Sequence, residues 1–130
     1  MSTTTVMVVE DDAALLARFC SIVAQSPELS LLAAAGDLAS ARQALHGGAP
    51  DVLLTDLGLP GVSGGELARS AATVRPGMEV VYVSGIPQDI AVKKGLIKAG
   101  SPFIAKPFTT DVLAGMLRSV LARHSNLPAP

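Results

Sequence analysis

The chain has 130 residues, of which 49% are apolar and 16% are charged, and its net charge is −1. This composition predicts one folded domain with a packed core and excludes an intrinsically disordered chain. The balanced charge argues against direct binding of nucleic acid, which needs clustered Lys and Arg, and against a polybasic contact with a membrane surface.

Cysteine and targeting signals point to a reducing compartment. The single cysteine, Cys20, allows no disulfide framework and no cysteine-based zinc site, and we interpret it as a small buried hydrophobe rather than a reactive thiol. The sequence lacks an apolar run of about 18 residues and a basic, signal-like start. We therefore predict a cytoplasmic protein without a membrane partner.

Five short apolar runs rich in branched side chains are predicted as strands. They occupy residues 6–9, 29–35, 51–55, 79–83 and 103–105. The first, third and fourth runs do not alternate polar with apolar residues. That pattern is typical of strands buried on both faces in a parallel sheet covered by helices.

Apolar residues at helical spacing lie between these strands and after the last one. Asp12 is the predicted N-cap of the first helix, Gly36 or Asp37 begins the second, and Thr109 or Thr110 caps the fifth. Five strand–helix repeats predict an α/β domain with a mostly parallel sheet over residues 1–123, followed by a tail or linker stub at 124–130.

The fourth predicted helix, residues 88–99, differs from the others. Three lysines and Gly95 interrupt its thin apolar stripe, so we expect it to be weakly anchored. A solvated surface helix and an element that is free to shift both explain this pattern.

Charged and hydroxyl side chains follow four of the predicted strands. They are Glu10, Asp11, Asp56, Ser84 and Lys106. Because ligand sites in parallel α/β sheets lie beyond the carboxyl ends of the strands, we expect these side chains to meet in a functional cluster.

The chemistry of such a cluster follows from its charges. Three carboxylates in a small cleft cannot all stay ionised without a compensating cation, and Lys106 supplies a single positive charge. Oxygen ligands without His or Cys fit Mg²⁺. A carboxylate beside Mg²⁺, a lysine and a hydroxyl could attack phosphorus and form an aspartyl phosphate.

Four motifs carry a family resemblance. "VVEDDAALL", "DVLLTDLGLPGVSGGEL", "VVYVSG" and "FIAKPF" resemble, in this order, the motifs of receiver (response-regulator) domains of bacterial two-component signalling. The resemblance covers about residues 4–123. It implies a flavodoxin-like, doubly wound (βα)5 fold with a five-stranded parallel sheet in the order 2-1-3-4-5 and helices on both faces.

The resemblance also implies roles for individual residues. Asp56 would be the phospho-acceptor, assisted by Lys106 and Ser84. The Mg²⁺ ligands would be Glu10 through a water, the Asp11 and Asp56 side chains, and the Gly58 carbonyl. Asp12 would cap the first helix and would not bind the metal.

Three further expectations follow from the same resemblance. Ser84 and Phe103 take the positions of switch residues, although Phe103 is equally well explained as a core residue. A cis bond is expected between Lys106 and Pro107. Gly58 and Ile86, two residues beyond the acceptor and the hydroxyl, have no polar side chain that could orient a hydrolytic water, so we expect a long-lived phosphoryl state.

The implied partners are proteins. A histidine kinase or histidine phosphotransfer protein would supply the phosphoryl group, and a downstream effector or output domain would read the face formed by helix four, strand five and helix five. A homodimer through this face is possible by the same resemblance. Enzymatic activity would be limited to self-phosphorylation from the donor and autodephosphorylation.

Three alternatives remain open. The chain could be a stand-alone receiver or a piece of a hybrid kinase or transcription regulator. It could be a degenerate receiver-like binding module that is never phosphorylated. It could also be a phosphatase of the haloacid-dehalogenase type, but that class needs a second Asp where Gly58 stands.

Overall fold

The computed structural model describes residues 4–48, 50–57, 64–75 and 77–125 of the chain, and these form a parallel sheet with helices around it. The strands are β1 (Thr4–Val9), β2 (Leu29–Ala35), β3 (Val52–Asp56), β4 (Glu79–Ser84) and β5 (Phe103–Ala105). The helices are α1 (Ala13–Ala24), α2 (Leu38–His46), α3 (Gly64–Val74), α4 (Gln88–Lys93) and α5 (Thr110–Ser125). All paired strands run parallel in the order β2-β1-β3-β4-β5, which confirms the predicted fold class.

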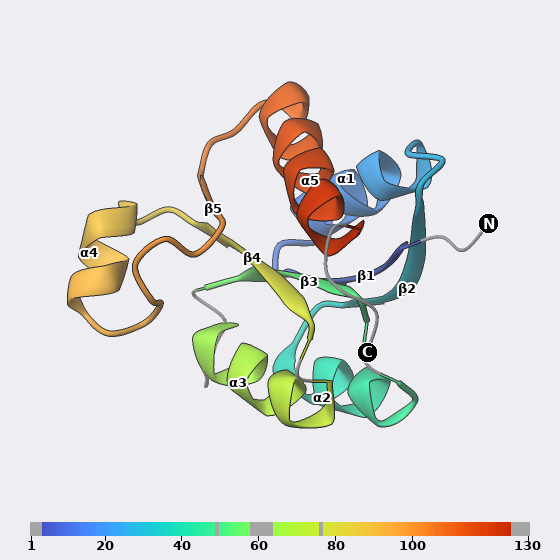
Figure 1. Ribbon diagram of the computed structural model, residues 1–130, viewed down its shortest axis with the longest axis horizontal. Helices are drawn as coiled ribbons and strands as arrows, with labels where there is room; N and C mark the ends of the chain where they lie inside the picture. The colour runs from blue at the N-terminus through green and yellow to red at the C-terminus, as the bar shows by residue number, and fades with distance from the viewer. Residues whose placement is uncertain (1–3, 49, 58–63, 76, 126–130) are drawn as a thin grey trace.

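Two helical layers cover the sheet. In Figure 1, α1 and α5 lie on one face, α2 and α3 lie on the other, and α4 lies beyond the β4–β5 side. Each layer has its own core of buried apolar side chains. The central strands β1 and β3 therefore bury side chains on both faces, which explains why neither strand alternates polar with apolar residues.

The register of the strands brings the polar residues to one edge. Val9 of β1 pairs with Thr55 of β3, so the residues that follow, Glu10 and Asp56, emerge side by side. On the other side of β3, Ser84 of β4 pairs with Ala105 of β5, directly before Lys106. Parallel pairing thus turns residues far apart in the sequence into neighbours.

Side-chain caps begin three helices as the sequence predicts. The Asp12 Oδ1 atom accepts a hydrogen bond from the Leu15 N–H at 2.9 Å, and Asp37 Oδ1 accepts one from the Ser40 N–H at 2.7 Å. Thr109 Oγ1 accepts a hydrogen bond from the Val112 N–H at 3.2 Å. Each cap satisfies a backbone donor that has no partner within its own helix.

The fourth helix is shorter than predicted, and the expectation of a helix over 88–99 is wrong at its C-terminal end. α4 ends at Lys93, and Gly95 follows with φ +73°. The Gly95 N–H bonds the Val92 carbonyl and the Leu96 N–H bonds the Ala91 carbonyl, each at 3.0 Å. These two bonds form a Schellman motif, which ends a helix at a glycine in the left-handed conformation.

Smaller differences occur elsewhere. α5 continues to Ser125, past the predicted domain boundary at residue 123, and the rest of the predicted tail lies outside the described residues. Cys20 is half-buried rather than buried. Within the described residues, no helix combines the length and apolar character that crossing a bilayer requires.

Candidate functional site

Three carboxylates converge where β1 and β3 end. One oxygen atom from each of Glu10, Asp11 and Asp56 lies within 4.8 Å of the others. Glu10 is fully buried and Asp56 nearly so, whereas Asp11 is exposed at the start of the β1–α1 connection. The predicted acidic cluster therefore exists as a compact site with one open side.

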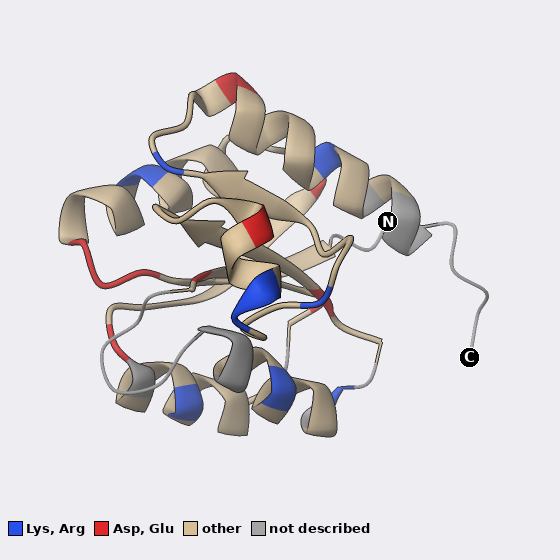
Figure 2. Cartoon of the chain, turned by 90° about the vertical axis from the view of Figure 1, so that its left-hand side faces the viewer, with Lys and Arg blue, Asp and Glu red and all other residues tan. Residues whose placement is uncertain are grey.

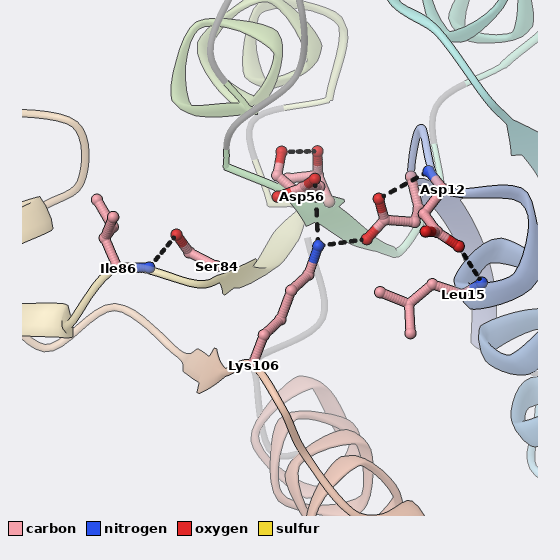
Figure 3. Close-up of polar contacts among 8 residues, drawn as sticks. Asp12, Leu15, Asp56, Ser84, Ile86 and Lys106 are labelled. Atoms are coloured by element: carbon pink, nitrogen blue, oxygen red, sulfur yellow. Dashed lines mark hydrogen bonds and ion pairs between the residues drawn. The ribbon is translucent and has the colours of Figure 1, made fainter.

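Lys106 reaches into this cluster from the end of β5. Its Nζ atom lies 2.8 Å from Glu10 Oε1 and 3.3 Å from Asp56 Oδ2. Figure 3 shows the Lys106 side chain extending toward Asp56. Its backbone N–H donates to the Ser84 carbonyl at 2.8 Å, and the following peptide bond to Pro107 is cis.

Both carboxylate oxygen atoms of the buried Glu10 side chain have a partner. Its Oε2 atom accepts a hydrogen bond from the Asp12 N–H at 3.1 Å, and its Oε1 atom forms an ion pair with Lys106 Nζ at 2.8 Å. One lysine cannot balance the negative charge of three clustered carboxylates. Their all-oxygen donor set fits a hard divalent cation such as Mg²⁺.

Ionisation equilibria in the cluster reflect its crowding. Burial raises the pKa of Glu10, and the neighbouring Asp11 and Asp56 raise it further against the opposing effect of Lys106. A hydrogen bond with Glu10 lowers the pKa of Asp11. Burial alone would lower the pKa of Lys106, but its contacts with Glu10 and Asp56 raise it overall, which keeps this side chain positively charged.

Ser84 is buried at the same edge of the sheet, and its hydroxyl oxygen bonds a backbone N–H outside the acidic cluster. Its Oγ atom accepts the Ile86 N–H at 3.1 Å, and Figure 3 shows this bond on the side of Ser84 away from Asp56. A Cβ atom placed on Gly85 would meet nothing within 4 Å, so the space beside Ser84 is open. The hydroxyl could therefore turn toward a group held at Asp56.

Of the two remaining predicted site residues, the structure describes Phe103 but not Gly58. Phe103 is half-buried and packs with Tyr82 against the small core cluster that contains Leu57 and Ala91. This location joins β5 to the region of α4. Gly58, the predicted backbone ligand, lies outside the described residues.

A neighbouring cavity was not foreseen from the sequence. It has a volume of about 300 Å³ and lies between α1 and the β5–α5 connection, where Leu15, Arg18, Lys106, Pro107 and Phe108 line it. The residues from α1 stand about 90 positions before those of the connection. No local pattern announces such a contact, because it depends on the packing of two distant elements.

Residues 6–118 match the response regulator receiver domain family. The chain therefore belongs to this family, and it is a receiver domain of two-component signalling whose acidic pocket is formed by Glu10, Asp11 and Asp56. This membership does not favour the phosphatase alternative.

Individual relatives agree with the family. The chain is 32% identical over 124 residues to the DNA-binding response regulator MtrA of Mycobacterium tuberculosis, a match that covers 95% of this chain and 53% of MtrA. The chain thus spans about half the length of this relative. A shorter match of 81 residues at 30% identity, covering 62% of this chain and 35% of the relative, relates it to the transcriptional regulatory protein CreB of Escherichia coli.

Solved structures share the architecture. The receiver domain of DrrB, a Thermotoga maritima protein solved in a BeF3-activated form, superposes with a TM-score of 0.75 at 25% identity. The match covers 94% of this chain and 100% of that domain.

Proposed function

We propose that Asp56 is the phospho-acceptor of this receiver domain and that the donor is a phosphohistidine on a histidine kinase or a histidine phosphotransfer protein. The observation that carries the proposal is the convergence of Asp56 with two further carboxylates and with Lys106 Nζ, which lies 3.3 Å from Asp56 Oδ2. Family membership supports a kinase-type partner.

The transfer requires one bond to form and one to break. An Asp56 carboxylate oxygen bonds to phosphorus as the phosphorus–nitrogen bond of the donor breaks, and the departing imidazole takes a proton from solvent. Lys106 is already placed to neutralise a phosphoryl oxygen, and the Ser84 hydroxyl could leave the Ile86 N–H to donate to another. Positioning and charge neutralisation are the main demands of phosphoryl transfer.

Glu10, Asp11 and Asp56 would hold Mg²⁺, with the Gly58 carbonyl as an expected further ligand. When bound, this ion would neutralise negative charge between the acceptor carboxylate and the incoming phosphoryl group. Three carboxylates, with one oxygen atom of each within 4.8 Å of the others, face the single positive charge of Lys106, and this imbalance supports a second cation at this position.

Ser84 and Phe103 lie on the neighbouring strands β4 and β5, and this arrangement could carry the effect of phosphorylation to the protein surface. Movement of the Ser84 hydroxyl toward a phosphoryl group would draw β4 with it, and Tyr82, which pairs with Phe103, would transmit the shift to the region of α4. We propose that the α4–β5–α5 face, including Ser84 and Phe103 as switch residues, is read by an effector protein or output domain in the cytoplasm. A homodimer through this face is one form of such a partner.

Incubation with acetyl phosphate and Mg²⁺, followed by intact-mass spectrometry, tests the acceptor. Wild type should gain one phosphoryl group as acetate is released, and Asp56→Asn should gain none. Asp12→Asn is the matched control, because it removes a nearby acid but keeps a side chain that can cap α1. Its labelling should equal that of wild type.

Two other results would contradict the proposal. Absence of labelling on the wild type would favour the degenerate binding module. Labelling that persists on Asp56→Asn would place the acceptor at another residue.

A further inference from the structure

Arg18 on α1 contacts the connection between β5 and α5, which contains Lys106. The Arg18 guanidinium carbon lies 4.9 Å from the centre of the Phe108 ring, a cation–π contact. One of its nitrogens, Nη2, donates to the Phe108 carbonyl at 3.3 Å and to Thr110 Oγ1 at 3.4 Å. These contacts lie two and four residues after Lys106.

An aromatic residue of α1 also contacts Phe108. Its ring stacks on that of Phe19, with centroids 5.2 Å apart and planes inclined by 8°. Phe19 is buried in the core, so it gives the ring a rigid support. Consecutive residues of α1 therefore hold the same side chain of the β5–α5 connection.

Because a cavity lies beside Lys106, the contacts of Arg18 and Phe19 with Phe108 matter for the position of the lysine side chain. Lys106 and Pro107 line a space of about 300 Å³ whose other walls are Leu15, Arg18 and Phe108. Because close packing is what normally locks a side chain in one rotamer, the lysine stem is less constrained on this side. The position of the stem then depends on the backbone on either side of it.

That backbone has two anchors. On one side, the Lys106 N–H bonds the Ser84 carbonyl at 2.8 Å and ties the residue to β4. On the other side, the contacts of Arg18 with Phe108 and Thr110 tie the connection to α1. Glu10, which forms an ion pair with Lys106 Nζ, lies in the connection that leads from β1 into α1, so the tip of the lysine side chain and the backbone that follows it are both held from this part of the chain.

We infer that Arg18 is a positioning residue for phosphoryl transfer, acting through Phe108 to hold Lys106 Nζ at the acceptor. Arg18 does not touch the acidic cluster in the described structure, and its effect is transmitted by the connection. The inference rests on the proposed function of Asp56 and adds a residue that no motif of the chain contains.

The test compares phosphorylation rates by acetyl phosphate at saturating Mg²⁺, measured by intact mass, in two backgrounds. In the wild-type background, Arg18→Ala should lower the maximal rate constant roughly 10-fold, within the loss of up to about 100-fold that a misplacement of about 1 Å can cause. In a Lys106→Met background, Arg18→Ala should cause no further loss, since the residue through which it acts is gone.

Three variants separate positioning from folding. Arg18→Lys keeps a cation over the Phe108 ring but has no guanidinium fork, and it should restore part of the rate. Arg42→Ala removes an exposed arginine on α2 and should leave the rate unchanged. Thermal unfolding by circular dichroism shows whether each variant is folded, and if Arg18→Ala is not, the comparison is made with Arg18→Gln.

The possible results are distinct. Equal rates for Arg18→Ala and wild type would overturn the positioning role and leave Asp56 as the acceptor. An equal loss in both backgrounds would show a general structural role and would also overturn it. If wild type is not phosphorylated at all, the proposed function itself fails before Arg18 is tested.

Discussion

Single residues set the chemistry of this domain, and Ile86 is the one most open to test. Its N–H donates to the Ser84 hydroxyl oxygen, and its side chain has no polar group. We predict slow hydrolysis of the phosphorylated wild type and faster hydrolysis of Ile86→Asn, because an amide can orient an attacking water.

Loss of the phosphoryl mass over time measures both rates. Ile90→Asn, a change at an exposed apolar position on α4, is the control and should hydrolyse at the wild-type rate. A wild-type half-life of a few seconds would contradict the prediction.

Asp51 is a residue with a structural rather than a chemical task, at the opposite end of β3 from Asp56. Its Oδ2 atom accepts hydrogen bonds from the Thr5 N–H at 2.8 Å and from Thr5 Oγ1 at 3.1 Å, and its side chain pairs with Arg75. Asp51→Ala leaves a part-buried backbone donor of β1 without its partner. We predict a loss of roughly 2 kcal/mol in the free energy of unfolding, measured by urea titration.

Arg75→Ala breaks the same ion pair from its exposed side, where the arginine side chain is 40% accessible. This variant should lose less than about 1 kcal/mol, because exposed ion pairs contribute little. Equal losses in the two variants would show that the ion pair, and not the hydrogen bonds to Thr5, stabilises the junction of β1 and β3.

At the scale of elements, two glycines provide opposite tests of helix structure. Gly95 ends α4 with φ +73°, whereas Gly115 lies inside α5, where a Cβ atom would meet nothing within 4 Å. Gly95→Ala should cost about 1 kcal/mol, since a side chain strains the left-handed conformation. Gly115→Ala should gain up to about 1 kcal/mol, because alanine favours the helix interior.

Chemical denaturation measures both glycine variants against wild type. A stability gain in Gly95→Ala would contradict the end of α4 described above. It would indicate that the helix continues through residue 95, as the sequence pattern predicts.

Helix α2 carries a pH-dependent cap. The hydrogen bond from the Ser40 N–H lowers the pKa of Asp37 from its ordinary 3.8. Its ionised form therefore stabilises the fold above the unfolded-state pKa, and this contribution is lost as the pH falls through the lower folded-state pKa.

We predict that the unfolding temperature of wild type falls more than that of Asp37→Asn over this acidic range. Asparagine can also cap a helix but does not titrate there. The difference should be small, since solvent screens an exposed charge. Parallel melting curves in acidic buffers measure it, and identical slopes would exclude a contribution from the cap.

We expect phosphorylation to displace α4 and the residues around it. Helix α4 has six residues. Figure 2 views the molecule from the side of this helix and shows its acidic start and basic end. Among the residues that the structure describes, its small core contains three buried side chains, those of Leu57, Ala91 and Ile97. A short helix with a small core can be displaced at low cost, which suits an output surface.

For the whole molecule, ligand binding and folding are linked through the acidic pocket. Beryllofluoride with Mg²⁺ should bind the folded state at Asp56 and should not bind the unfolded chain. At a ligand concentration 100-fold above its Kd, the free energy of unfolding should rise by about 2.7 kcal/mol.

Thermal melts with and without the two ligands measure this gain, and Asp56→Asn should lose it. Removal of Mg²⁺ with a chelator should reverse it in wild type. An equal gain in Asp56→Asn would show that the ligand binds at another site.

The sequence by itself determined the architecture and the membership of the acidic pocket. Branched apolar runs and helical spacing are local patterns, and a parallel sheet must bring the ends of β1, β3, β4 and β5 to one edge. The sequence alone therefore groups Glu10, Asp11, Asp56 and Lys106. The caps at Asp12 and Asp37 were predictable for the same reason, since each depends on four consecutive residues.

Other features were decided only by the tertiary structure. The contact of Arg18 with Phe108 and the cavity beside Lys106 arise where distant segments pack together. Their geometry depends on the angles and distances between elements, which no short window of sequence encodes. The end of α4 lies between these cases, because the sequence contains Gly95 but does not fix its left-handed conformation, which depends on the surrounding backbone.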